Sequence, residues 1–131
     1  MINEQYKYSE LTSRIIGCAM TVHSALGNGF QEVIYQRALS LEMHSLHLEF
    51  AREIEIPIFY KHYEKEIGTR RADFLVEGKV LIETKAQIQL DDVHLAQILN
   101  YLKAYKIEVG LLINFGSKSL TFKRVVLDLK K

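Results

Sequence analysis

Two acidic residues and one lysine lie on neighbouring segments, in a spacing that could support hydrolytic chemistry. Asp73 falls within residues 70–76, and Glu83 and Lys85 fall within residues 80–86. Both segments have the composition of strands and a short loop separates them, which predicts a β-hairpin. Facing carboxylates in a hairpin have Cβ atoms about 5 Å apart and repel each other unless a cation intervenes. Such oxygens suit Mg²⁺, and a metal ion beside an ammonium group can stabilise a reacting phosphodiester.

The loop determines which side chains of the hairpin face each other. A three-residue loop at residues 77–79, with Gly78 supplying a positive φ, pairs Val76 with Val80. This register predicts an apolar face that pairs Ala72 with Thr84, Phe74 with Ile82 and Val76 with Val80, and an opposite face that pairs Arg71 with Lys85, Asp73 with Glu83 and Leu75 with Leu81. A two-residue loop would place Asp73 opposite Ile82 and mix charge into the core, so we expect the three-residue loop.

The charged face of the hairpin has two interpretations. Arg71 and Lys85 lie on the diagonals from the two acids, so the four side chains could form a surface charge network without a function. Alternatively, Asp73 and Glu83 could hold a divalent cation that keeps water molecules for chemistry. The hairpin alone favours the charge network, because charged strand faces are common.

The wider sequence resembles a known nuclease signature. Residues 71–73 and 82–85 supply an acid, a second acid and a lysine two positions later, as in the PD-(D/E)XK nuclease superfamily. Residues 29–35 resemble the motif that names the GxxExxY proteins, a branch of that superfamily. Gln97 and Tyr101 resemble the QxxxY element that follows the core motif in many members. The order of these motifs is similar to that family over most of the chain.

The resemblance implies a role for each matching residue. Asp73 and Glu83 would bind a divalent metal, Mg²⁺ or Mn²⁺, together with the backbone carbonyl of Thr84. Glu32 would be the acid contributed by the helix before the sheet, although an acid in a first helical turn is also explained by the helix dipole. Lys85 would orient or activate the attacking water and offset charge on the phosphate; arginine would carry the charge but could not easily release a proton.

Two further groups of polar residues are candidates for substrate contacts. His94, Gln97 and Tyr101 lie at three- and four-residue steps, so they share one strip of a helix that could orient the nucleophile or contact a phosphate. A hydrogen-bonded helix face is the alternative, and for His94 it is the simpler one. Tyr35 is expected to pack and to form hydrogen bonds rather than to catalyse.

Basic residues near the C-terminus form the second group. Besides Arg71 on the hairpin, we expect Lys123 and Arg124 to contact the substrate phosphates. Lys118, Lys130 and Lys131 belong to the same basic region. The alternative is a charged tail that keeps the protein soluble.

Periodicity along the chain predicts the elements that hold these residues. Helical spacing is expected over residues 9–26, with Ser9 as the N-cap, over 30–46, and from Asp91 or Asp92 to 105. Strands are expected over 53–60, 70–76, 80–86, 109–115 and 120–127, and Pro57 places the first of them at an edge or bulge. The order ααβββαββ predicts an α/β fold, a restriction-endonuclease-like core with a mixed β-sheet flanked by helices, formed by residues 1–131 as one domain.

Composition narrows the classes of function. The chain has 131 residues, of which 48% are hydrophobic, and a net charge of +1, so any site for a polyanion must be local. The single cysteine, the charged N-terminus and the lack of a long apolar run indicate a cytoplasmic protein without a membrane partner.

Two functions remain after these exclusions. The complete set of motif residues favours a metal-dependent nuclease, acting on DNA more than on RNA, in which a homodimer could cut both strands. The modest charge favours the alternative, a non-catalytic nucleic-acid-binding or protein-assembly module that keeps the nuclease fold. No phosphate-binding glycine loop or nucleophile elbow supports a small-molecule enzyme.

Overall fold

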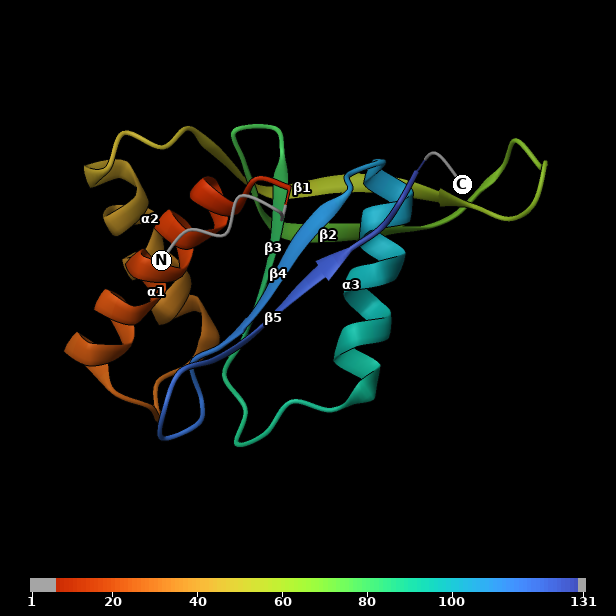
Figure 1. Ribbon diagram of the computed structural model, residues 1–131. Helices are drawn as coiled ribbons and strands as arrows, with labels where there is room; N and C mark the ends of the chain where they lie inside the picture. Colours follow the sequence, from red (N-terminus) through yellow and green to blue (C-terminus); the bar gives the residue numbers. More distant parts are fainter. Residues whose placement is uncertain (1–6, 130–131) are drawn as a thin grey trace.

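The helices and strands follow one another in the predicted order. The computed structural model of the protein describes residues 7–129. Its elements are α1 (Ser9–Leu26), α2 (Glu32–Ser45), β1 (Phe50–Phe59), β2 (Glu66–Val76), β3 (Val80–Lys85), α3 (Asp92–Tyr105), β4 (Val109–Asn114) and β5 (Thr121–Val126). The strands form one sheet in the order β1-β2-β3-β4-β5, in which β3 and β4 run parallel and the other pairs antiparallel. The mixed sheet confirms the predicted α/β architecture (Figure 1).

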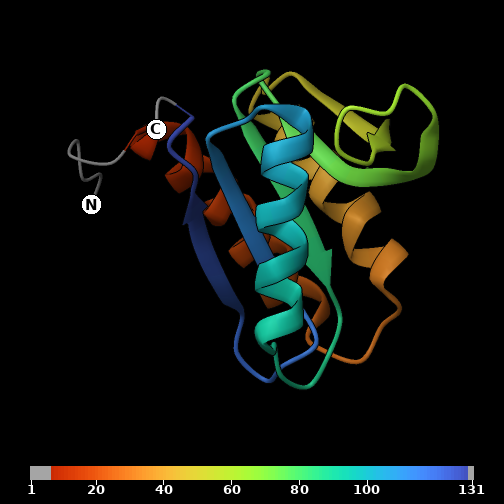
Figure 2. The same cartoon turned by 90° about the vertical axis from the view of Figure 1, so that its right-hand side faces the viewer.

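Helices cover both faces of the sheet. α1 and α2 pack on one face through buried side chains at helical spacing, such as Ile15 and Val22 in α1 and Leu39 in α2. Tyr35 is fully buried, its ring stacks on Phe115, and its hydroxyl donates to the carbonyl of Gly27 at 2.6 Å. These contacts agree with the packing role predicted for Tyr35. Figure 2 shows α3 on the opposite face from α1 and α2.

α3 connects the two parallel strands and covers the second face. Ile98 and Leu102 of α3 pack against Leu81 of β3 and Leu112 of β4. Because parallel neighbours cannot be joined by a tight turn, the chain between β3 and β4 crosses over the sheet as this helix. β4 is buried along its whole length, as its nearly continuous apolar sequence predicts. None of the helices within residues 7–129 is both long enough and apolar enough to cross a membrane.

The starts of two helices differ from the prediction, for local reasons. Tyr8, not Ser9, is the N-cap of α1; it has a left-handed backbone with φ of 57° and packs against the core, so packing sets this helix start. α2 begins at Glu32 instead of residue 30, because the Phe30 N–H donates to the Tyr35 hydroxyl at 3.1 Å and lies outside the helix.

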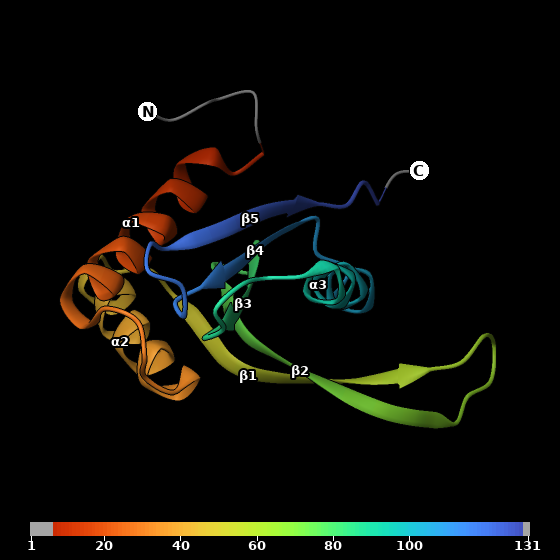
Figure 3. The ribbon, with the colours of Figure 1, turned by 90° about the horizontal axis from the view of Figure 1, so that it is seen from below.

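β1 and β2 are longer than predicted and extend away from the rest of the molecule. β2 begins at Glu66 instead of residue 70, and β1 begins at Phe50 instead of residue 53. Residues 66–71 are exposed on both faces, so their sequence carries no alternation that would reveal a strand. We call residues 56–70, the projecting part of this hairpin, the arm (Figure 3). β1 lies at the sheet edge, which confirms the placement inferred from Pro57.

Tyr105 ties the base of the arm to α3. Its hydroxyl accepts a hydrogen bond from the N–H of Ala72 at 3.1 Å and donates to the carbonyl of Ile54. Ile54 and Ala72 are partners in the β1–β2 register, so the hydroxyl enters the ladder between the two strands. The orientation of the arm relative to α3 is thereby fixed at this point.

Candidate active site

Asp73 and Glu83 meet where β2 and β3 separate. The pairing of Phe74 with Ile82 is as predicted, as are the two pairs between it and the turn, and the regular ladder ends there. Beyond this point Asp73 Oδ2 accepts hydrogen bonds from Thr84 N at 2.7 Å and from Thr84 Oγ1 at 2.8 Å. The Asp73 N–H donates to Glu83 Oε1 at 3.1 Å. Each acid is therefore held by the backbone or side chain of the other strand.

The predicted apolar face is wrong at one residue, Ala72. Ala72 packs with Leu81 on the α3 side of the sheet, whereas Phe74 packs on the α1–α2 side. The alternation of β2 is therefore interrupted at Asp73. Glu53 of β1, which would face Asp73, has a φ of 51°, and neither residue is a register partner of the other. This local distortion lets the Asp73 carboxylate reach Thr84.

A third acid reaches the same place from α2. Glu32 Oε1 lies 3.4 Å from the hydroxyl of Thr84, the residue that also binds Asp73. Gln36, one turn further along α2, donates to the same hydroxyl at 2.9 Å. The fully buried Thr84 side chain thus links α2 to the two strand acids. Sequence reasoning assigned Thr84 only a backbone role and overlooked Gln36, although a polar residue four positions after Glu32 was a usable signal.

Burial raises the pKa values of all three acids. The pKa of Glu83 rises to about 8, first because the carboxylate is buried and then because the Asp73 charge is close. Burial also raises the pKa of Asp73, and burial together with the Asp73 charge raises the pKa of Glu32. Lys85 lowers the pKa of each of the three acids. One ammonium group, that of Lys85, is therefore shared by three acids.

The second cation near this cluster is Arg52, not Arg71. Arg71 forms an exposed ion pair with Glu55 of β1 at 3.3 Å, so it does not bridge the two acids as the diagonal geometry predicts. Arg52 lowers the pKa of Asp73 and donates to Gln36 Oε1 at 3.3 Å. Its Nε atom is buried and has no hydrogen-bond partner within residues 7–129. Sequence reasoning missed Arg52, because the first strand was expected to begin at residue 53, after Arg52.

α3 brings Tyr101 toward the acids and gives His94 a structural role. The pKa of Tyr101 is raised by burial and then by the charge of Glu83. Gln97 is half-buried one turn before Tyr101 on the same helix. His94 is buried and its Nδ1 accepts a hydrogen bond from the Asp91 N–H at 3.1 Å, forming a capping box at the start of α3. This contact confirms the hydrogen-bonded interpretation of His94.

Comparison with known proteins agrees with this arrangement. A family model described as the PD-(D/E)XK nuclease superfamily matches residues 9–125. The chain belongs to the PD-(D/E)XK nuclease superfamily. The sheet order and flanking helices are therefore those of the predicted restriction-endonuclease-like fold. The fold is also similar to the crystal structure of SSO0001, with a TM-score of 0.58 and 20% identity; the match covers 92% of this chain and 61% of that one. No curated protein matches the sequence.

The donor atoms of the cluster fit the divalent metals that nucleases of this superfamily generally use. Asp73 and Glu83 supply hard carboxylate oxygens, and Mg²⁺ typically takes only one or two carboxylates from a protein. Within residues 7–129, no three His, Cys, Asp or Glu side chains converge as a preformed metal-binding group. Burial and then the nearby Asp73 charge raise the pKa of Glu83, and a bound divalent cation would favour its ionised form. The residues present therefore fit Mg²⁺ or Mn²⁺.

The basic residues of β5 lie apart from the superfamily motif. Lys123 and Arg124 are on the edge strand β5, which is separated from β3 by β4. Arg124 donates to the carbonyl of Lys7 near the start of α1. Lys118 lies in the β4–β5 connection, and Lys130 and Lys131 fall outside the described residues. The structure does not bring these residues to the acidic cluster, and their contact with substrate remains a prediction.

Hydrogen bonds join the end of β3, which carries Lys85, to the end of β4. The carbonyl of Lys85 accepts a hydrogen bond from Phe115 N at 2.8 Å. The Asn114 side chain accepts from Gln87 N at 2.9 Å and donates to Gln87 O at 2.8 Å. Gly116 lies against this segment so closely that an added Cβ would be 2.2 Å from Gln87 N. The position of Lys85 therefore depends on a glycine at residue 116.

We expect Gly116→Ala to lower the free energy of unfolding by about 2 kcal/mol or more, because backbone atoms must move to admit the methyl group. Gly17→Ala is the matched control. Gly17 lies inside α1 with open space around its Cβ position, so alanine there should stabilise the protein by about 0.5–1 kcal/mol. Urea denaturation followed by circular dichroism measures both changes. Equal stability of the two variants would show that the β3–β4 contact is not tight.

Proposed function

We propose that this protein is a metal-dependent nuclease that hydrolyses phosphodiester bonds of nucleic acids with Mg²⁺ or Mn²⁺. The observation that carries the proposal is the cluster of half-buried Asp73 and buried Glu83, joined through the Asp73 N–H and sharing one ammonium group, that of Lys85. Burial of an acid destabilises its charged form, as the raised pKa of Glu83 reflects, and acids with such shifted pKa values cluster at functional sites.

The proposed roles follow from the position and charge of each side chain. Asp73 and Glu83, with the Thr84 carbonyl, would hold the metal, and Glu32 would add a third acid from α2. A bound divalent cation supplies positive charge at the phosphate and lowers the pKa of a coordinated water. Lys85 would offset charge on the phosphate and orient the attacking water.

The face of α3 would contact the substrate next to these acids. The phenolic hydroxyl of Tyr101 can donate to a phosphate oxygen, and the amide of Gln97 can orient the nucleophile. The nearness of Tyr101 to Glu83 is seen in the effect of the Glu83 charge on the pKa of Tyr101. Gln97 occupies the preceding turn of the same face.

The GxxExxY branch is the part of the superfamily that we propose for this chain. Gly29 has a φ of 110°, which favours glycine, and it precedes the helix that carries Glu32. The Tyr35 hydroxyl accepts from Phe30 N and donates to Gly27 O, which fixes the loop that leads into α2. The three motif residues therefore have one common effect, which is to bring Glu32 to Thr84.

We further propose DNA as the preferred substrate, a cytoplasmic location, and action as a homodimer on duplexes. A buried free thiol at Cys18 supports a reducing environment. One cluster of this kind can cut one strand at a time, so a second copy would be needed to cut both strands of a duplex.

A non-catalytic nucleic-acid-binding or assembly module is the second candidate. The observation that favours it is the lack, within residues 7–129, of a preformed group of three metal-binding side chains. Such a module would bind nucleic acid equally well with and without divalent metal and would leave it intact.

Cleavage of DNA and RNA in the presence of Mg²⁺ or Mn²⁺ distinguishes the two candidates. We expect the wild type to cleave at least one of these substrates, and Asp73→Asn to lose activity by roughly a hundredfold or more because a metal-binding charge is removed. Glu10→Gln, which changes an exposed acid on α1, is the matched control and should retain full activity. Equal cleavage by the wild type and Asp73→Asn would assign the activity to another site or to a contaminant.

A further inference from the structure

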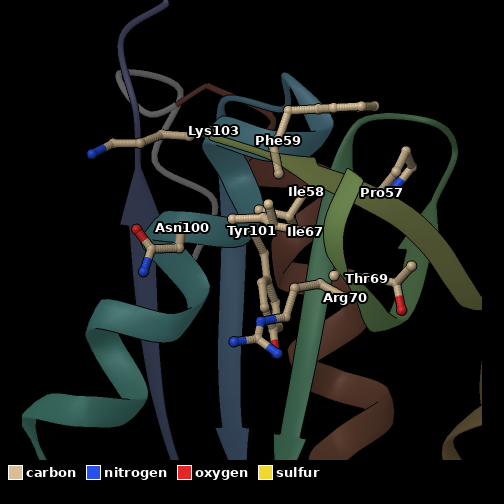
Figure 4. A pocket seen from close by; sticks show the side chains of 11 residues that line it. Pro57, Ile58, Phe59, Ile67, Thr69, Arg70, Asn100, Tyr101 and Lys103 are labelled. Carbon is tan, nitrogen blue, oxygen red and sulfur yellow. The ribbon is translucent and has the colours of Figure 1, made fainter. Parts of the chain in front are cut away.

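A groove runs between the arm and α3, next to the acidic cluster. Its volume is about 630 Å³, and Figure 4 shows the side chains that line it. The arm contributes an apolar wall that includes Pro57, Ile58 and Ile67, and α3 contributes Tyr101 and Lys103. Figure 3 shows the arm extending past α3 and away from the body of the protein.

The charge of the groove is opposite to that of the cluster it adjoins. Arg70 and Lys103 line it, and none of the described residues that line it is acidic. In Figure 4 the Arg70 side chain lies beside the ring of Tyr101. Tyr101 itself is close enough to Glu83 and Arg70 that both charges alter its pKa. A polyanion that binds at Arg70 and Lys103 would therefore meet no acidic side chain of the groove on its way to the proposed metal site.

The outer end of the arm carries a group of exposed aromatic rings. Tyr60 and Tyr63 are 52% and 57% exposed, and their rings are parallel, with a 6.1 Å separation between centroids. The His62 ring stacks on Tyr63 at 5.0 Å, and the Lys61 ammonium lies 5.1 Å from the centre of the Tyr60 ring. Interleaved aromatic and basic side chains suit single-stranded nucleic acids, because each unpaired base offers a flat face for stacking.

We propose that the groove and the aromatic end of the arm bind a single strand of nucleic acid and direct it toward Asp73 and Glu83. Arg70 and Lys103 neutralise backbone phosphates, and Tyr60 and Tyr63 stack on unpaired bases. A duplex keeps its base faces covered, so it gains nothing from the aromatic rings. The inference rests on the proposed nuclease activity and adds to it a substrate class, single-stranded or unpaired nucleic acid.

Fluorescence anisotropy with a labelled single-stranded DNA 20-mer tests this proposal. The titration is done without divalent metal, so that no cleavage occurs, and is repeated with the same sequence as a duplex. We expect tighter binding of the single strand. Tyr60→Ala with Tyr63→Ala should raise the single-strand dissociation constant roughly tenfold or more and leave duplex binding unchanged. Arg70→Gln should reduce the slope of log K against log salt by about 0.7, which is one phosphate contact of a single strand.

Matched variants separate a specific role from a general loss of structure or charge. Tyr60→Phe with Tyr63→Phe keeps both rings and should bind as the wild type does. Lys79→Ala, in the β2–β3 turn, removes a lysine that does not line the groove and should leave the salt slope unchanged, unlike Lys103→Ala.

The possible outcomes distinguish this inference from the proposed function. Unchanged single-strand binding by both the tyrosine and the Arg70 variants would overturn the inference, and so would self-association of the wild type that these variants abolish, since the groove would then bind a second copy. Single-strand cleavage that survives the arm substitutions at the wild-type rate would overturn the inference but leave the nuclease. Single-strand binding through the arm, without cleavage in Mn²⁺, would leave the inference and exclude the nuclease.

Discussion

Lys85→Ala is expected to reduce metal-dependent cleavage by roughly a hundred- to a thousandfold while leaving metal binding intact. Removal of one positive group from a reacting oxyanion typically has an effect of this size. Lys85 is the ammonium group that lowers the pKa of Glu32, Asp73 and Glu83, so it competes with any bound cation for their charge. Its loss should therefore preserve or strengthen Mn²⁺ binding even as activity falls.

Cleavage rates and Mn²⁺ titrations of the same protein samples measure the two effects separately. Lys85→Arg keeps the charge but releases a proton far less easily, so partial recovery of activity would assign an electrostatic role to the residue. Lys79→Ala serves as the control for removal of a lysine elsewhere on the same hairpin. A Lys85→Ala protein that cleaves at the wild-type rate would exclude this residue from the reaction.

Glu83→Gln is expected to change how the stability of the metal-free protein depends on pH. The pKa of Glu83 is about 8 in the folded protein, against 4.5 for an exposed carboxyl, so the folded state holds a proton that the unfolded state releases between these values. The contribution of Glu83 to the free energy of unfolding is fully present below about pH 4.5 and is lost as the pH rises toward 8. Between pH 5 and 8.5 the wild type should lose roughly 3–5 kcal/mol through Glu83.

Burial sets the sign of this effect, and the groups that face Glu83 modify its size. The charges of Asp73 and Glu32 raise the pKa of Glu83, whereas Lys85 and the Asp73 N–H lower it. The pKa values of Asp73 and Glu32 are raised as well. Glutamine cannot ionise but can still accept from the Asp73 N–H, so the variant should be the more stable protein at pH 8.5. Urea denaturation at pH 5 and 8.5 measures the difference, and Mg²⁺ should stabilise the wild type at pH 8.5 more than the variant. If the stability of the two proteins depended on pH in the same way, the pKa of Glu83 would not be raised in the folded protein.

Much of the fold follows from local sequence, and the exceptions have physical causes. The helices and the buried strand β4 are periodic or continuously apolar, so their existence and order follow from the sequence. The start of β2 does not, because residues 66–71 are exposed on both faces and carry no apolar alternation. The start of α2 depends on the hydrogen bond from the Phe30 N–H to the Tyr35 hydroxyl, and the helix propensities of single residues do not predict such a contact.

The candidate site also has some features that the sequence predicts and others that it does not. The turn at Gly78 sets the β2–β3 register, so the proximity of Asp73 and Glu83 could be predicted from the loop length alone. The shift of Ala72 to the other face could not, because it accompanies a backbone distortion at Glu53 and Asp73 that leaves no pattern in the sequence. The resemblance to the superfamily motifs supplied Glu32, which lies far from the hairpin in sequence and reaches it only through Thr84. The groove depends on the arm, whose length the sequence pattern did not reveal.

Calorimetric titration with Mn²⁺ tests the central claim most directly, namely that Asp73 and Glu83 form a divalent-metal site. The wild type should bind Mn²⁺ with release of protons, because the raised pKa of Glu83 means that the metal displaces a proton at neutral pH. Asp73→Ala should abolish this binding, and Glu10→Ala, which removes an exposed acid on α1, should leave it unchanged. A wild-type protein that binds no Mn²⁺, or an Asp73→Ala protein that binds it as well as the wild type, would contradict the claim.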